Sequence, residues 1–223
     1  MSQLNPEIQL LKQKLIEMQR LVRMQLNKCY SALIDYDINI AKEVIFNEKR
    51  VNALELKIDW DCENMLALYS PVAVDLRFIL AALKINNNLE RIGDYAKGIA
   101  HYVIDVQTPF PKEILLDYKF AEMFSVTSAM INDSIVAFVN EDTTLARSIF
   151  AQDEVLDKFN KDATETTLKY IEEKRPDGLH YLNSLSIIRK LERVGDQTKN
   201  IVEEIIFYIE AKVLKHPDKR EEL

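Results

Sequence analysis

The chain carries nearly the same eleven residues twice, as LERIGDYAKGI from Leu89 and as LERVGDQTKNI from Leu191. A shift of 102 positions superposes the two segments and leaves seven identical pairs. The apolar positions of the segments that precede them superpose with a shift of 105 instead. The difference between these two shifts falls in the turn that separates the segments, where RPDG from Arg175 replaces Pro71 of the first half. A duplication whose length changes fall in loops indicates two copies of one structural unit.

Few residues that favour turns interrupt the chain, since it has only four glycines and six prolines among 223 residues. An all-β fold needs turn residues roughly every 8–12 positions, so this composition favours helices. The breaks predict a first helix from Asn5 to the sequence DYD and a second from there to Pro71. Four more are predicted over 72–104, 113–139, 142–174 and after RPDG.

Long helices joined by short turns lie antiparallel to their neighbours. The sequence therefore predicts an all-α fold of six long antiparallel helices that form two tandem, pseudo-symmetric three-helix bundles. The first bundle is expected over 1–105 and the second over 113–223. The segment VQTPFPKE contains two prolines, which predicts a linker at 106–112.

The net charge of −7 and the absence of a basic run exclude the electrostatic pattern of a protein that binds nucleic acid or an anionic membrane. The most apolar stretch, FILAALKI, is far shorter than the ~20 residues that span a bilayer, and the first ten residues lack the form of a signal peptide. A cytoplasmic protein without direct membrane insertion is expected. Cys29 and Cys62 are solitary in apolar stretches, which predicts buried free thiols.

Each copy of the repeated segment carries two acids four residues apart, Glu90 with Asp94 and Glu192 with Asp196. Such residues share a helix face, where like charges cost a few tenths of a kcal/mol. One interpretation is a solvated acidic face with Lys97 or Arg91 as counter-ion. However, the same stripe is apolar seven residues earlier, at Leu83 and Leu185. The acids are therefore expected to emerge from a partly buried strip.

The preceding helices add carboxylates on matching flanks, Glu48, Glu55 and Asp59 in the first half and Asp153 and Asp157 in the second. Asp153 stands at the position of Glu48, and Asp157 at that of Asn52. Carboxylates from adjacent helices, with little histidine and no cysteine cluster, suit Mg²⁺, Mn²⁺, Fe or Ca²⁺ and also accept Zn²⁺. A carboxylate metal centre in each half is the second interpretation. Asn160 and Thr164 stand where the first half has Glu55 and Asp59, so the two centres are expected to differ in nuclearity or affinity.

Gly93 and Gly195 lie within predicted helices, where glycine costs about 1 kcal/mol relative to alanine. Either a close helix crossing or space for a bound ion cluster would explain them. His101 lies about 10 Å along the helix axis from Asp94 and is not expected to be a ligand. His180 and His216 fit no ligand spacing.

The paired LER-[IV]-GD motifs, the segment SPVAVDLR from Ser70 and the acid-bearing helices resemble the PhoU family of phosphate-uptake regulators. The resemblance spans the whole chain. It implies a non-enzymatic cytoplasmic homodimer, peripheral to the inner membrane through its partners. Those partners are the phosphate ABC transporter and its sensor histidine kinase, and contact with them restrains phosphate uptake and phosphate-starvation signalling.

The resemblance also implies multinuclear sites for divalent or trivalent ions such as Fe, Zn, Mn or Mg. The implied ligands are Glu48, Glu55, Asp59, Glu90, Asp94, Asp153, Asp157, Glu192 and Asp196. Two other functions remain open, a metal-free helical adaptor and a carboxylate-bridged di-metal enzyme. The enzyme is disfavoured because such sites use Glu-x-x-His pairs and this chain has none. There is no Gly-rich phosphate loop, and hence no sign of direct phosphate binding.

Overall fold

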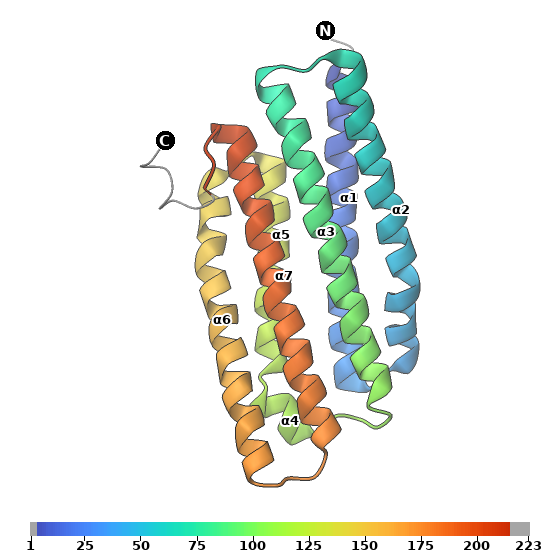
Figure 1. The fold of residues 1–223 in the computed structure, drawn as a ribbon, viewed down its shortest axis with the longest axis vertical. Helices are drawn as coiled ribbons and strands as arrows, with labels where there is room; N and C mark the ends of the chain where they lie inside the picture. Colours follow the sequence, from blue (N-terminus) through green and yellow to red (C-terminus); the bar gives the residue numbers. More distant parts are fainter. Residues whose placement is uncertain (1–3, 215–223) are drawn as a thin grey trace.

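A computed structural model describes residues 4–214, which form seven helices and no strand (Figure 1). The helices are α1 (Leu4–Asp35), α2 (Ile38–Tyr69), α3 (Ala73–Asp105), α4 (Lys112–Asp117), α5 (Phe120–Asn140), α6 (Thr143–Glu172) and α7 (Gly178–Glu210). Six of them are long, and α4 has six residues. His216 lies outside the described residues.

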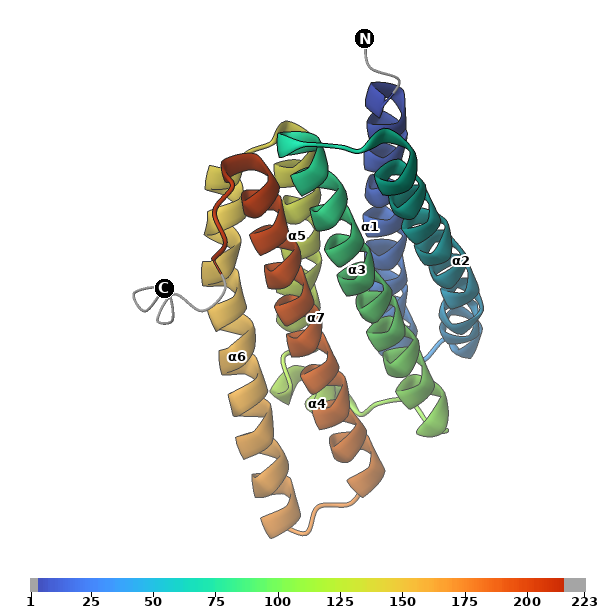
Figure 2. The ribbon, with the colours of Figure 1, turned by 45° about the horizontal axis from the view of Figure 1, so that its top comes forward.

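The helices form two three-helix bundles, and the predicted fold class is confirmed. Helices α1, α2 and α3 pack together, as do α5, α6 and α7. Helix α3 lies beside α7 and α1 lies beside α5, while α2 and α6 are outermost (Figure 1, Figure 2). The colours in Figure 1 show that α3 descends where α7 ascends. The two bundles are therefore antiparallel to each other along a shared seam.

An aspartate begins the second helix of each bundle. The Asp37 carboxylate accepts hydrogen bonds from two backbone N–H groups of α2 at 2.8 and 3.1 Å, and Asp142 accepts two from α6 at 2.9 Å. These caps satisfy N–H groups that a helix leaves unpaired in its first turn. The caps are 105 positions apart, so the shift found for the second helices extends to the turn before them.

The apolar side chains of both bundles form one continuous core. Val51 on α2 and Leu156 on α6, which the repeat places at equivalent positions, are both fully buried. Cys29 and Cys62 are buried and free, as predicted. No described helix combines the length and apolar character needed to cross a bilayer.

The predicted helix over 113–139 is divided in two by Lys119, whose backbone is left-handed with φ of 49°. The break turns Tyr118 into the core, where its hydroxyl lies 2.7 Å from Thr167 Oγ1 and 3.2 Å from the Tyr181 carbonyl oxygen. No glycine or proline marks this break, which is why the sequence pattern predicted one helix. The linker predicted at 106–112 ends inside α4, whose first residue is Lys112, and α1 already includes Leu4.

Candidate metal centres

The nine predicted acids lie on two pairs of packed helices. The first acid cluster joins α2 to α3 and consists of Glu48, Glu55, Asp59, Glu90 and Asp94. The second acid cluster joins α6 to α7 and consists of Asp153, Asp157, Glu192 and Asp196. Each predicted set is thus gathered on one helix pair, at equivalent places in the two bundles.

Gly93 and Gly195 allow these helix pairs to approach closely. A Cβ atom on Gly93 would lie 3.0 Å from Val51 Cγ1, and one on Gly195 would lie 2.4 Å from Leu156 Cδ1. Both neighbours are fully buried, so neither can turn into solvent. Close helix packing therefore explains both glycines. The absence of a side chain at Gly195 also leaves space for the Asp153 carboxylate, whose Oδ1 would lie 3.2 Å from the added Cβ.

The carboxylates of the first acid cluster repel one another. Burial raises the pKa of Glu90 above its ordinary value, and the charges of Asp94 and Glu55 raise that pKa further. Burial also raises the pKa of Glu55, and Asp59 and Asp94 add to the rise. Glu48 contributes to the rise at Glu90 as well. The five acids therefore form one electrostatic unit whose charged form a bound cation would stabilise.

The second acid cluster has the same character. Burial raises the pKa of Glu192, and the charges of Asp196 and Asp157 raise it further. Burial also raises the pKa of Asp153, which is only 5% exposed, and its ion pair with Lys199 offsets part of that rise. Repulsion between carboxylates is thus repeated at equivalent positions of the two halves.

Lys97 is the counter-ion of the first acid cluster. Its Nζ lies 3.3 Å from Glu48 Oε2 and 4.0 Å from Asp94 Oδ1, so it connects an acid of α2 to an acid of α3. Glu48 is 6% exposed, and Lys97 is its ion-pair partner. Of the two counter-ions considered from the sequence, Lys97 has this role, while Arg91 is exposed.

Lys199 has the same position in the second acid cluster. Its Nζ pairs with Asp153 Oδ2 and lies 3.2 Å from Asp196 Oδ1. Partial burial lowers the pKa of Lys199, but the hydrogen bonds to these two carboxylates outweigh burial and raise it. The lysine is therefore a charged partner held between the two helices.

Sequence reasoning missed Asn86, which is fully buried on α3. Its side-chain amide donates to Asp59 Oδ1 at 2.8 Å and to the Glu55 carbonyl oxygen at 3.0 Å. These bonds fix the α2 end of the first acid cluster. A signal was available, because Asn86 lies one turn before Glu90 on the same helix stripe.

The donor chemistry of both clusters fits a hard cation, because every candidate ligand is an oxygen. The buried amide oxygens of Asn52 and Asn160, on the acid-bearing flanks of α2 and α6, have no hydrogen-bond partner within residues 4–214. They are further oxygen donors without another role. Within the same residues, no three Asp, Glu, His or Cys side chains converge closely enough to hold one ion. In the structure, Lys97 and Lys199 supply the positive charge between the acids of the two clusters.

The two histidines within residues 4–214 take no part in either cluster. His180 is buried at the start of α7, where its Nε2 lies 3.2 Å from Thr108 Oγ1 and its ring packs edge-on against Phe110 at 5.2 Å between centroids. His101 is exposed near the end of α3. The described part of the chain therefore provides oxygen donors alone.

Comparisons with known proteins match each bundle separately and then the whole fold. A sequence model of the PhoU domain matches residues 15–103 and 120–205. The chain is 30% identical over 210 residues to the phosphate-specific transport system accessory protein PhoU homolog of Aquifex aeolicus. This alignment covers 94% of each of the two chains.

Two crystal structures share the fold along nearly their full length. One is PhoU from Pseudomonas aeruginosa, with a TM-score of 0.88 and 31% identity over 94% of this chain and 100% of that one. The other is the phosphate transport system regulatory protein PhoU from Streptococcus pneumoniae, with a TM-score of 0.86 and 26% identity over 95% and 99% of the two chains.

Proposed function

The chain belongs to the PhoU family, and on this premise we propose that it is a non-enzymatic negative regulator of phosphate uptake and phosphate-starvation signalling. Its relatives carry the names of accessory and regulatory proteins of phosphate transport, and they match it over almost its whole length. We expect it to act in the cytoplasm by contact with the phosphate ABC transporter and its sensor histidine kinase.

We further propose that the two acid clusters bind metal ions and that the ions adjust these contacts. The observation that supports this proposal is the gathering of carboxylates at equivalent places on two packed helix pairs, where burial and neighbouring charges raise the pKa of Glu90 and of Glu192. A bound Mg²⁺, Mn²⁺, Fe or Zn²⁺ ion would supply the positive charge that both clusters require. Lys97 and Lys199 supply part of that charge in the structure, so an ion would compete with them.

Elemental analysis of protein purified without chelator tests the metal sites. The variants Glu90→Gln/Asp94→Asn and Glu192→Gln/Asp196→Asn each remove one cluster's charge on α3 or α7. Each should lose the metal of its own half and keep that of the other. A matched control is Glu154→Gln/Glu165→Gln, which neutralises two exposed acids of α6 outside the clusters. Unchanged metal content in both cluster variants would show that the assigned ligands are wrong.

A deletion strain tests the regulatory role. Loss of the protein should leave phosphate-starvation genes expressed in phosphate-rich medium, and the wild-type gene should restore repression. Normal repression in the deletion strain would refute the proposed function. Full complementation by a variant that carries all four changes, Glu90→Gln, Asp94→Asn, Glu192→Gln and Asp196→Asn, would favour the metal-free adaptor instead.

The outer face of α2 is a candidate surface for the predicted homodimer. Its large exposed apolar residues share one stripe and comprise Phe46, Leu56, Trp60 and Leu68. The equivalent positions of α6 hold Ala151, Lys161, Glu165 and Glu173, so only the first bundle carries the stripe. Light scattering on the wild type and on Leu56→Glu/Trp60→Glu tests the assignment. A dimer should become a monomer, whereas a dimer that survives the double change uses another surface.

A further inference from the structure

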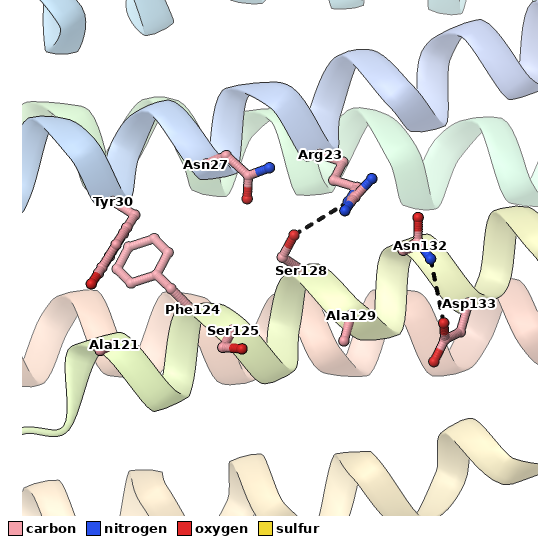
Figure 3. Close-up of a pocket in the computed structure, with 10 residues that line it drawn as sticks. All are labelled: Arg23, Asn27, Tyr30, Ala121, Phe124, Ser125, Ser128, Ala129, Asn132 and Asp133. Atoms are coloured by element: carbon pink, nitrogen blue, oxygen red, sulfur yellow. Dashed lines mark hydrogen bonds between the residues drawn. The ribbon is translucent and has the colours of Figure 1, made fainter.

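A hollow of about 430 Å³ lies between α1 and α5, on the seam where the two bundles meet. Figure 3 shows Arg23 and Asn27 extending from α1 toward a face of α5 that carries Ser125 and Ser128. The volume falls within the range of about 300–1,000 Å³ that is usual for small-molecule sites. Unlike the acid clusters, this hollow is lined mainly by hydrogen-bond donors and by one arginine.

Small side chains on α5 create the space. Ala121, Ser125, Ser128 and Ala129 recur at helical spacing along the face that meets α1. Arg23 and Ser128 are 105 positions apart, which is the interval between the two aspartate helix caps. They are thus equivalent positions of the repeat that face each other across antiparallel helices. One bundle supplies a cation there, and the other supplies room and a hydroxyl group.

Arg23 has no carboxylate partner among the described residues. Its Nε donates to Ser128 Oγ at 3.2 Å, and its two terminal nitrogens have no partner in that part of the chain. Arg20, one turn away, likewise forms no ion pair within residues 4–214, and it lines an adjoining hollow of about 280 Å³ that shares Arg23 and Asn27. The Asn27 amide and the Ser125 hydroxyl also lack protein partners in the described structure. Several donors therefore face the same space.

Asp133 is the one carboxylate that lines the hollow. It accepts hydrogen bonds from Gln152 of α6 at 3.1 Å and from the neighbouring Asn132 at 3.5 Å. Figure 3 places Asp133 at the end of the hollow opposite Tyr30. Both of its donors are neutral amides, and within residues 4–214 it forms no ion pair with Arg23.

We propose that the hollow between α1 and α5 binds a phosphate-type oxyanion, either inorganic phosphate or the phosphoryl group of a small organic ester. A tetrahedral oxyanion accepts several hydrogen bonds at once, and a guanidinium group with hydroxyl and amide donors matches that need. The space exceeds one phosphate, so an ester's organic part fits beside Tyr30 and Phe124, whose ring centroids are 5.3 Å apart. A bound anion connects the first bundle to the second.

Titration calorimetry of the full chain with inorganic phosphate and with glycerol 3-phosphate tests the proposal at constant ionic strength. A chelator is included so that ions at the acid clusters cannot retain phosphate, which makes the result independent of the proposed metal function. We expect saturable binding of at least one probe. Tighter binding of glycerol 3-phosphate identifies an ester as the ligand, and equal or tighter binding of inorganic phosphate identifies the free anion.

Two variants locate the site. Arg23→Gln removes the charge and should weaken binding about tenfold or more, because a charge-assisted hydrogen bond is lost. Ser128→Asp gives Arg23 a carboxylate partner, so the fold is kept and anion binding is lost. The matched control is Arg189→Gln, which removes an exposed arginine of α7 outside the hollow. No saturable binding by the wild type, or equal binding by Arg23→Gln and Arg189→Gln, overturns the proposal.

Discussion

The change Gly195→Ala tests whether close packing is the reason for glycine in the second repeated segment. The added Cβ would lie 2.4 Å from Leu156 Cδ1, so the buried leucine must leave its position. Overpacking of this kind costs about 1–3 kcal/mol. The better helix propensity of alanine returns about 1 kcal/mol. We therefore expect Gly195→Ala to lower the free energy of unfolding by up to about 2 kcal/mol.

The same change in a Leu156→Ala background should have the opposite sign. Leu156→Ala costs about 2–5 kcal/mol by itself, but it also removes the atom that the new Cβ would meet. Gly195→Ala should then stabilise that background by up to about 1 kcal/mol through helix propensity, because the remaining contact with Asp153 Oδ1, at 3.2 Å, is less severe. The double-mutant cycle should therefore give a coupling of about 1–3 kcal/mol between the two positions.

Urea unfolding followed by far-UV circular dichroism, with chelator present, measures all four proteins of the cycle. The chelator separates the two interpretations of the glycine, because space for an ion matters only when an ion is bound. Gly93→Ala is the matched comparison, since its Cβ would meet Val51 at the less severe distance of 3.0 Å. An equal effect of Gly195→Ala in both backgrounds would refute the packing explanation.

Three further experiments test other parts of the structure. Lys199→Met leaves the buried Asp153 carboxylate without its ion-pair partner, so it should lower the free energy of unfolding by about 1–3 kcal/mol in chelator. Saturating Mn²⁺ should restore the lost stability. Equal urea midpoints for the variant and the wild type in chelator would contradict this pairing. Asp37→Ala and Asp142→Ala should each cost about 1 kcal/mol in thermal unfolding, because each removes a two-bond helix cap, and a loss at only one of them would show that the caps are not equivalent. Tyr118→Phe should lower the free energy of unfolding by about 1 kcal/mol, because it removes the hydroxyl contacts with α6 and α7. Tyr95→Phe is the control, since it removes no hydrogen bond of the described structure. Similar unfolding midpoints for the two variants would contradict the account of the α4–α5 break.

The fold followed from the sequence because its signals are local and repeated. Helical spacing of apolar residues, sparse glycine and proline, and the repeated segments 102 positions apart all predict the same helices. The break at Lys119 could not be predicted in this way. Its cause is tertiary, since Tyr118 meets Thr167 and Tyr181 on two other helices. Neither partner is near it in the sequence.

The sequence predicted which helix pairs carry the nine acids, but not the contacts that those acids make. Superposing the two halves was enough to group the nine acids, because equivalent residues on equivalent helices lie at equivalent places. The roles of Lys97 and Asn86 depend on side-chain direction across a helix crossing, which spacing along one helix does not determine. The meaning of Gly93 likewise depended on Val51, from another helix, lying against it.

Arg23 and Ser128 hold matching positions on antiparallel helices and meet each other across the seam. Their contact therefore lies close to the local twofold axis that relates the two halves. In a dimer of two identical single bundles, a residue at this place would face its own copy, and two guanidinium groups would repel each other there. Covalent duplication removes that constraint, since each copy of the position can change independently. The fused chain thus carries a single positive charge on its own symmetry axis, an arrangement that two identical half-length chains could not form.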